Sequence, residues 1–97
     1  FEKKHIPVIT LQKQCGLVGP GCLDGHIKIG AILHPMEAKH FIGYIDVYLD
    51  YNFISRVHFA PDKINPVLGV HLKASSGKLT ALSSCNLHGR WTGEAEL

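Results

Sequence analysis

The sequence lacks any long apolar run, because Asp, Lys, His or Pro soon interrupts each hydrophobic stretch. None approaches the ~20 residues that a membrane-spanning helix requires. It also has little charge: charged residues make up 19% of the chain and the net charge is +2 with neutral histidines. Disordered chains are typically rich in charge and poor in apolar residues, whereas 45% of this chain is hydrophobic. We therefore expect a folded domain, and the weak positive charge makes nucleic acid an unlikely partner.

Common catalytic and nucleotide-binding motifs are absent as well. The sequence contains no G-x-S-x-G, no P-loop, no G-x-G-x-x-G and no H-E-x-x-H. A cysteine–histidine dyad could be drawn in many ways among so many histidines, so it carries little information. From these absences we expect a protein that is not an enzyme and that needs no cofactor.

Alternation of apolar and polar residues dominates what is present, and a period of two is typical of β-strands. Residues 41–59 form two alternating runs separated by Asp50, Tyr51 and Asn52, which predicts a β-hairpin. Residues 68–83 predict a second hairpin around a turn at 74–77, and residues 6–12 and 26–33 predict further strands. A short helical turn is expected near 35–40. The sum is an all-β antiparallel sandwich or small barrel of about six to seven short strands.

At 97 residues the chain has room for one hydrophobic core. We therefore interpret residues 1–97 as a single β domain. Because the chain begins with Phe1, and no signal-peptide pattern follows, we expect it to be processed or excised from a larger protein. The absence of an N-x-[ST] acceptor site weakens an extracellular assignment without excluding it.

Three cysteines leave several states open: Cys15, Cys22 and Cys85 allow one disulfide of unknown pairing, or three free thiols. A bridge within the glycine-rich segment 15–22 is sterically feasible. A bridge from that segment to Cys85 would remove more entropy from the unfolded chain. One disulfide would favour a secreted or surface protein, so an extracellular or surface-exposed location is weakly favoured.

Seven histidines are the unusual feature of the composition. Cys22 and His26 form a C-x₃-H pair, and Cys85 and His88 form a C-x₂-H pair. Together they offer four ligands of the types that zinc prefers. The alternative interpretation is therefore a zinc-stabilised module that contacts nucleic acid.

The alternating run in the first hairpin places Tyr44, Asp46, Tyr48 and Asp50 on one face. Tyrosine is enriched at protein interfaces, although aromatic pairs also stabilise ordinary sheet surfaces. The leading hypothesis is thus a non-catalytic interaction module of a secreted, surface or virion protein, which binds a protein partner or itself. A small-ligand or lipid carrier is a further alternative.

Overall fold

Seven β-strands and one 3₁₀ turn form the architecture of the computed structural model, which describes residues 1–13 and 15–97. The elements follow the chain as η1 (Glu2–Lys4), β1 (Pro7–Gln12), β2 (Leu23–Ile29), β3 (Ile42–Leu49), β4 (Asn52–His58), β5 (Val67–Leu72), β6 (Lys78–Cys85) and β7 (Gly89–Glu96). The prediction of an all-β fold with six or seven short strands is confirmed. The helical turn lies at Glu2–Lys4 instead of near 35–40, where Glu37 and His40 pair through an isolated β-bridge.

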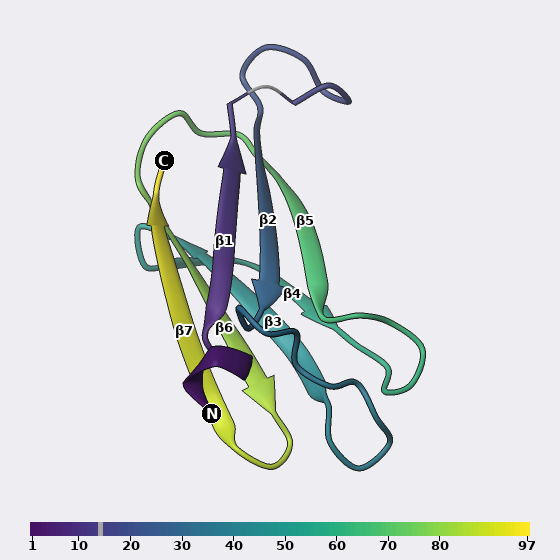
Figure 1. The fold of residues 1–97 in the computed structure, drawn as a ribbon. Coiled ribbons are helices and arrows are strands. Elements are labelled where there is room, and N and C mark those ends of the chain that lie inside the picture. Colours follow the sequence, from purple (N-terminus) through teal and green to yellow (C-terminus); the bar gives the residue numbers. More distant parts are fainter. Residues whose placement is uncertain (14) are drawn as a thin grey trace.

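The strands form two antiparallel sheets that face each other (Figure 1). One sheet has the order β1-β2-β5 and the other has the order β4-β3-β6-β7. The predicted hairpin at 41–59 is confirmed, because β3 pairs with β4 from Tyr44–His58 to Leu49–Asn52.

The second predicted hairpin is wrong. Strand β5 pairs with β2 in one sheet, whereas β6 pairs with β3 and β7 in the other, so the 73–77 connection crosses between sheets. Alternation requires only that one face of each strand be buried, and it does not specify which strand is the hydrogen-bonded neighbour.

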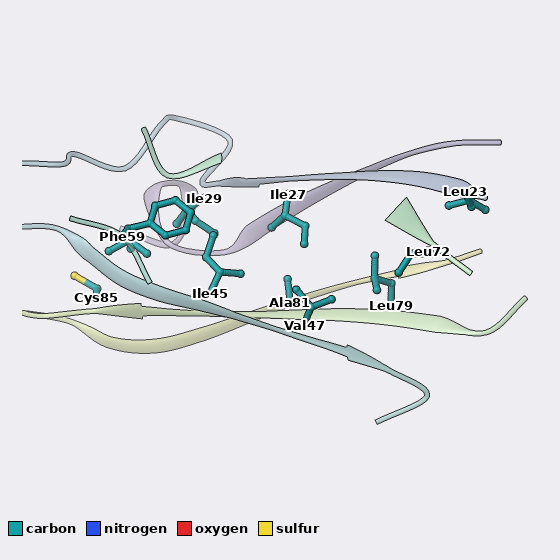
Figure 2. Packing of buried hydrophobic residues seen from close by; sticks show 11 residues of the cluster. Leu23, Ile27, Ile29, Ile45, Val47, Phe59, Leu72, Leu79, Ala81 and Cys85 are labelled. Atoms are coloured by element: carbon teal, nitrogen blue, oxygen red, sulfur yellow. The ribbon is translucent and has the colours of Figure 1, made fainter. Parts of the chain in front are cut away.

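The hydrophobic core lies between the two sheets (Figure 2). Ile27 and Ile29 project from the three-stranded sheet towards side chains of the four-stranded sheet, among them Ile45 and Val47. These four side chains have no exposed surface. Cys85 is also buried and lies at one end of this core, which places its thiol beside the loops at that end.

The predicted face of Tyr44, Asp46, Tyr48 and Asp50 is not uniformly exposed to solvent. Asp46 is buried and accepts two hydrogen bonds from the guanidinium of Arg56, one of them 2.8 Å from Nη2 to Oδ2. That hydrogen bond raises the pKa of Arg56, whose guanidinium also lies 4.1 Å from the centre of the Tyr44 ring. Asp50 lies in the β3–β4 turn and accepts a hydrogen bond from the backbone N–H of Lys78. Tyr48 packs against Phe53. A protein-binding role for this face stays a prediction.

The connections gather at the two ends of the sandwich (Figure 1). At one end lie η1, the β2–β3 connection and the β6–β7 turn. The β1–β2 loop and the 73–77 connection lie at the other. In the part of the chain that is described, no helix has the length and apolar character needed to cross a membrane.

Candidate metal centre

Five side chains with metal-ligating atoms converge at the end of the sandwich that carries η1. They come from the residue after η1, from the β2–β3 connection, from the end of β6 and from the β6–β7 turn: His5, His34, His40, Cys85 and His88. Ligand atoms of the first four all lie within 4.8 Å of one another. His5, His34 and Cys85 are buried, whereas His40 and His88 are partly exposed.

The four imidazole rings are arranged as a square. Neighbouring ring centres are 4.7 Å apart for His5 and His34, 4.6 Å for His34 and His40, 5.0 Å for His40 and His88, and 5.0 Å for His88 and His5. Each neighbouring pair is close to perpendicular, with interplanar angles of 76° to 85°. The diagonal from His5 to His40 is longer, at 6.3 Å. The histidines thus surround one common point, which is how ligands of a single ion are disposed.

Backbone carbonyls select the nitrogen that each buried histidine presents to this point. The Nδ1–H of His5 donates to the carbonyl of Phe1, and that of His34 donates to the carbonyl of Pro35, each at 2.7 Å. With Nδ1 protonated, Nε2 keeps its lone pair. The Nε2 atoms of His34 and His40 are buried and have no hydrogen-bond partner among the described residues. Buried nitrogens without partners are costly in a metal-free protein, and binding a metal removes that cost.

His88 presents its other nitrogen. Its Nδ1 lies 3.2 Å from Nε2 of His5 and 3.8 Å from Sγ of Cys85. The loop that carries it is fixed by Trp91, whose indole N–H donates to the His88 carbonyl at 3.0 Å. Phe1 packs against the rings of His5, His88 and Trp91.

The electrostatics of the cluster favour the neutral forms of His34 and His88. The pKa of His34 is lowered to about 4, mainly because the ring is buried. The hydrogen bond to the Pro35 carbonyl raises this pKa, whereas the neighbouring histidines lower it further. Burial, together with His5 and His40, also lowers the pKa of His88. Four imidazoles and one thiol form a mixed nitrogen and sulfur donor set suited to a transition-metal ion. The five residues therefore fit a metal.

Gly30 joins the two segments that supply His5 and His34. Its backbone has φ +90°, and its N–H donates to the carbonyl of Ile6. Ile32 in turn donates to the carbonyl of Lys3, which ties η1 to the β2–β3 connection. A Cβ at position 30 would lie 2.7 Å from the Lys4 carbonyl oxygen and 2.8 Å from that of Lys3. Glycine is therefore required at this position to place the two ligands side by side.

The structure divides the zinc ligand set expected from sequence. Cys85 and His88 come together, but Cys22 lies in a separate cluster with Cys15, Asp24 and His71 at the other end of the sandwich. His26 is exposed on β2. Cys15 and Cys22 form a disulfide, and Cys85 is a free, buried thiol.

Sequence reasoning missed His5, His34 and His40 as candidate ligands. The available signal was that each lies outside the central part of a predicted strand, where loops can bring distant residues together. The strand pattern gave no way to know that these loops share one end of the sandwich.

Fold and site together define a β-sandwich protein with a candidate metal centre of four histidines and one cysteine. The desulfoferrodoxin family model matches residues 1–94, and the chain belongs to the desulfoferrodoxin family.

Curated relatives and solved structures agree with this assignment. The chain is 36% identical over 102 residues to a putative superoxide reductase of Methanocaldococcus jannaschii. The match covers 100% of this chain and 84% of that protein. It is 31% identical to the desulfoferrodoxin of Desulfarculus baarsii, with 96% of this chain and 64% of that longer protein covered. The structure of superoxide reductase from Nanoarchaeum equitans superposes with a TM-score of 0.84 at 30% identity, covering 100% of this chain and 95% of that one.

These findings correct four expectations. The hypothesis of a non-catalytic interaction module is wrong, and so is the prediction that the protein is not an enzyme, because its relatives are named reductases. The expectation that no cofactor is needed is wrong too, since the family assignment and the histidine–cysteine cluster together mark a metal centre. The assignment to a secreted or virion interaction protein has no support from the family. Motif searches failed because a redox metal centre needs no nucleophile or nucleotide loop.

Proposed function

We propose that this protein is a superoxide reductase that binds one iron ion through His5, His34, His40, Cys85 and His88. The observation that carries the proposal is the square of four imidazoles with a buried free thiol beside it. The names of the relatives, which match over almost the whole chain, support the same activity. The reaction is O₂•⁻ + e⁻ + 2H⁺ → H₂O₂. The chemistry that bound iron supplies is the single electron, by changing from the ferrous to the ferric state.

The chain's own residues hold this centre in a fixed arrangement. Carbonyls of Phe1 and Pro35 orient the rings of His5 and His34, and the Trp91 indole holds the backbone of His88. Such second-layer hydrogen bonds fix the tautomer of a ligand and typically contribute 10–100-fold to metal affinity. The thiolate of Cys85 would add a negative charge and a polarisable sulfur ligand, which favours the ferric state after electron transfer.

Lysines beside the site are suited to attract an anionic substrate. Lys3 and Lys4 are exposed and lie within two residues of the ligand His5. Superoxide carries one negative charge, so positive side chains near its target increase the rate of encounter. Partial exposure of His40 and His88 leaves the cluster accessible from solvent.

The activity is tested with protein loaded with ferrous iron in the absence of oxygen. We expect a pulse of superoxide to oxidise one iron per superoxide and to produce hydrogen peroxide without releasing dioxygen. His40→Ala should lose most of the iron and the reaction, because it removes one corner of the square. Release of one dioxygen per peroxide would instead identify a dismutase, and full iron binding by the variant would overturn the proposed ligand set.

Removing the two lysines should slow the reaction without changing iron content. We expect Lys3→Ala/Lys4→Ala to lower the second-order rate with superoxide about 10-fold at low ionic strength, since electrostatic steering contributes 10–10³-fold in favourable cases. The dependence of the rate on salt should also weaken. The matched control is Lys13→Ala/Lys73→Ala, which removes the same charge from the opposite end. Equal rates for the two double variants would show that the position of the lysines is unimportant.

A further inference from the structure

A second group of metal-ligating side chains lies at the end of the sandwich opposite the first centre. We call Cys15, Cys22, Asp24 and His71 the thiol cluster. Their ligand atoms all lie within 4.8 Å of one another. The proposed reductase reaction uses none of these residues.

Two of the four residues of the thiol cluster lie on neighbouring strands of one sheet. Asp24 on β2 and His71 on β5 are direct partners in the antiparallel register. Side chains at such positions lie on the same face with Cβ atoms about 4.5–5.5 Å apart. Cys22 directly precedes β2 and lies two residues before Asp24. Two of the four groups are thus positioned by strand pairing, and a third directly precedes β2.

The glycine-rich loop brings Cys15 to the other three. Gly19 donates its backbone N–H to the Cys15 carbonyl at 2.8 Å, which closes a tight turn. Gly19 and Gly21 have φ values of +92° and +86°, which glycine adopts without strain. This geometry returns the chain so that Cys15 and Cys22 lie 5.3 Å apart at their Cα atoms.

Three groups compete for one nitrogen in this cluster. Nδ1 of His71 lies 2.7 Å from Oδ1 of Asp24, 2.8 Å from Sγ of Cys15 and 3.8 Å from Sγ of Cys22. A ring nitrogen carries at most one hydrogen, so it cannot satisfy a carboxylate and two sulfurs. Oδ1 of Asp24 is buried and makes no hydrogen bond despite this short distance. Atoms that gather in this way are disposed like ligands that share one cation.

We propose that Cys15, Cys22, Asp24 and His71 bind a zinc ion when the two cysteines are in the dithiol form. Two sulfurs, one imidazole nitrogen and one carboxylate oxygen are all donors that zinc accepts in tetrahedral sites. Zinc–ligand bonds of about 2.0–2.3 Å place the ligand atoms about 3.3–3.8 Å apart. The thiol cluster reaches these separations by small side-chain movements once the sulfurs are no longer bonded to each other.

The surrounding charge suits such a site. Two thiolates and one carboxylate carry three negative charges, and a divalent ion leaves one. Lys13 and Lys73 line the pocket that adjoins Cys22, where their positive charges offset the remainder. Because zinc does not change its oxidation state, the site would stabilise the loop and would not take part in electron transfer.

The disulfide and the zinc-bound state exclude each other. Reduction of the Cys15–Cys22 disulfide by a dithiol adds two electrons and two protons to the protein, and the reductant becomes a disulfide. The two thiols then release those protons when zinc binds. The thiol cluster therefore holds either a disulfide or a zinc ion.

The test measures metal content of the iron-loaded protein. The protein is reduced with dithiothreitol without oxygen, freed of reductant, exposed to one equivalent of zinc and analysed by mass spectrometry for both metals. We expect one iron and one zinc per chain. Cys15→Ser/Cys22→Ser should keep the iron and lose the zinc, and His71→Ala should bind zinc at least about 100-fold more weakly. In the iron-loaded native protein, cobalt substituted for zinc should add thiolate charge-transfer absorption.

The matched control is His26→Ala. His26 is exposed and lies two residues after Asp24 on β2, but it is not part of the thiol cluster. Its replacement should leave zinc binding unchanged. Absence of a second metal after reduction, or retention of zinc by the double cysteine variant, would overturn the proposal. Either result leaves iron binding at the other end unaffected, so it is distinct from failure of the proposed reductase function.

Discussion

Replacing Cys85 with serine should abolish the proposed reductase activity while leaving the fold intact. Serine has nearly the same shape, but its hydroxyl stays protonated near neutral pH and cannot supply an anionic sulfur ligand. We expect iron affinity to fall by more than about 100-fold, since even residues that only orient ligands contribute 10–100-fold. Absorption from thiolate-to-iron charge transfer should disappear. Iron titration followed by absorbance, with circular dichroism of the metal-free protein, measures both effects.

The control for Cys85→Ser is the double variant Cys15→Ser/Cys22→Ser. It removes the other two thiols, and these lie at the opposite end of the sandwich. The double variant should retain stoichiometric iron and its charge-transfer absorption. If Cys85→Ser kept both, the buried thiol would not be the sulfur ligand.

Gly30→Ala should damage stability and the metal centre together. Alanine at φ +90° is strained, and its Cβ would collide with carbonyl oxygens of Lys3, Lys4 and Ile32. The cost of a backbone-incompatible alanine exceeds about 1 kcal/mol, which in a domain of this size lowers the melting temperature by at least about 4–8 °C. Relieving the collision separates η1 from the β2–β3 connection, so iron affinity should fall as well.

Calorimetry and iron titration of the same variant test this coupling. Gly69→Ala is the matched control, because a Cβ there meets only the side chain of His26 at ordinary contact distance. It should change neither iron affinity nor melting temperature by a comparable amount. A Gly30→Ala protein that melts earlier but binds iron normally would separate the role of Gly30 in folding from a role in placing the ligands.

The fold was largely predictable from sequence because burial of one strand face imposes a period of two. That rule found the β3–β4 hairpin and the all-β class. It failed for β5 and β6, because alternation does not encode which strand lies next to which. The same rule placed Asp46 on a polar face, but Arg56 covers it from the neighbouring strand.

The metal centre was only partly predictable. Cys85 and His88 are close in sequence, so a local pattern detects them. His5 and His34 belong to segments that become neighbours through the β1–β2 pairing and the backbone contacts around Gly30. Their role depends on topology, which single-sequence patterns do not provide. The pairing of Cys22 with His26 failed for a local reason: His26 lies on the strand, beyond the positions that contact the loop.

The proposed ligands of the metal centre are far apart in the sequence, with a separation of 83 positions from His5 to His88. No local segment can form the centre alone, and contacts of such high sequence separation are usually late events in folding. Iron should therefore bind after the two sheets have docked, with little affinity for partly folded chains. Bound iron would join segments that are far apart in the sequence, so the metal-loaded protein should unfold far more slowly than the metal-free protein and resist proteolysis.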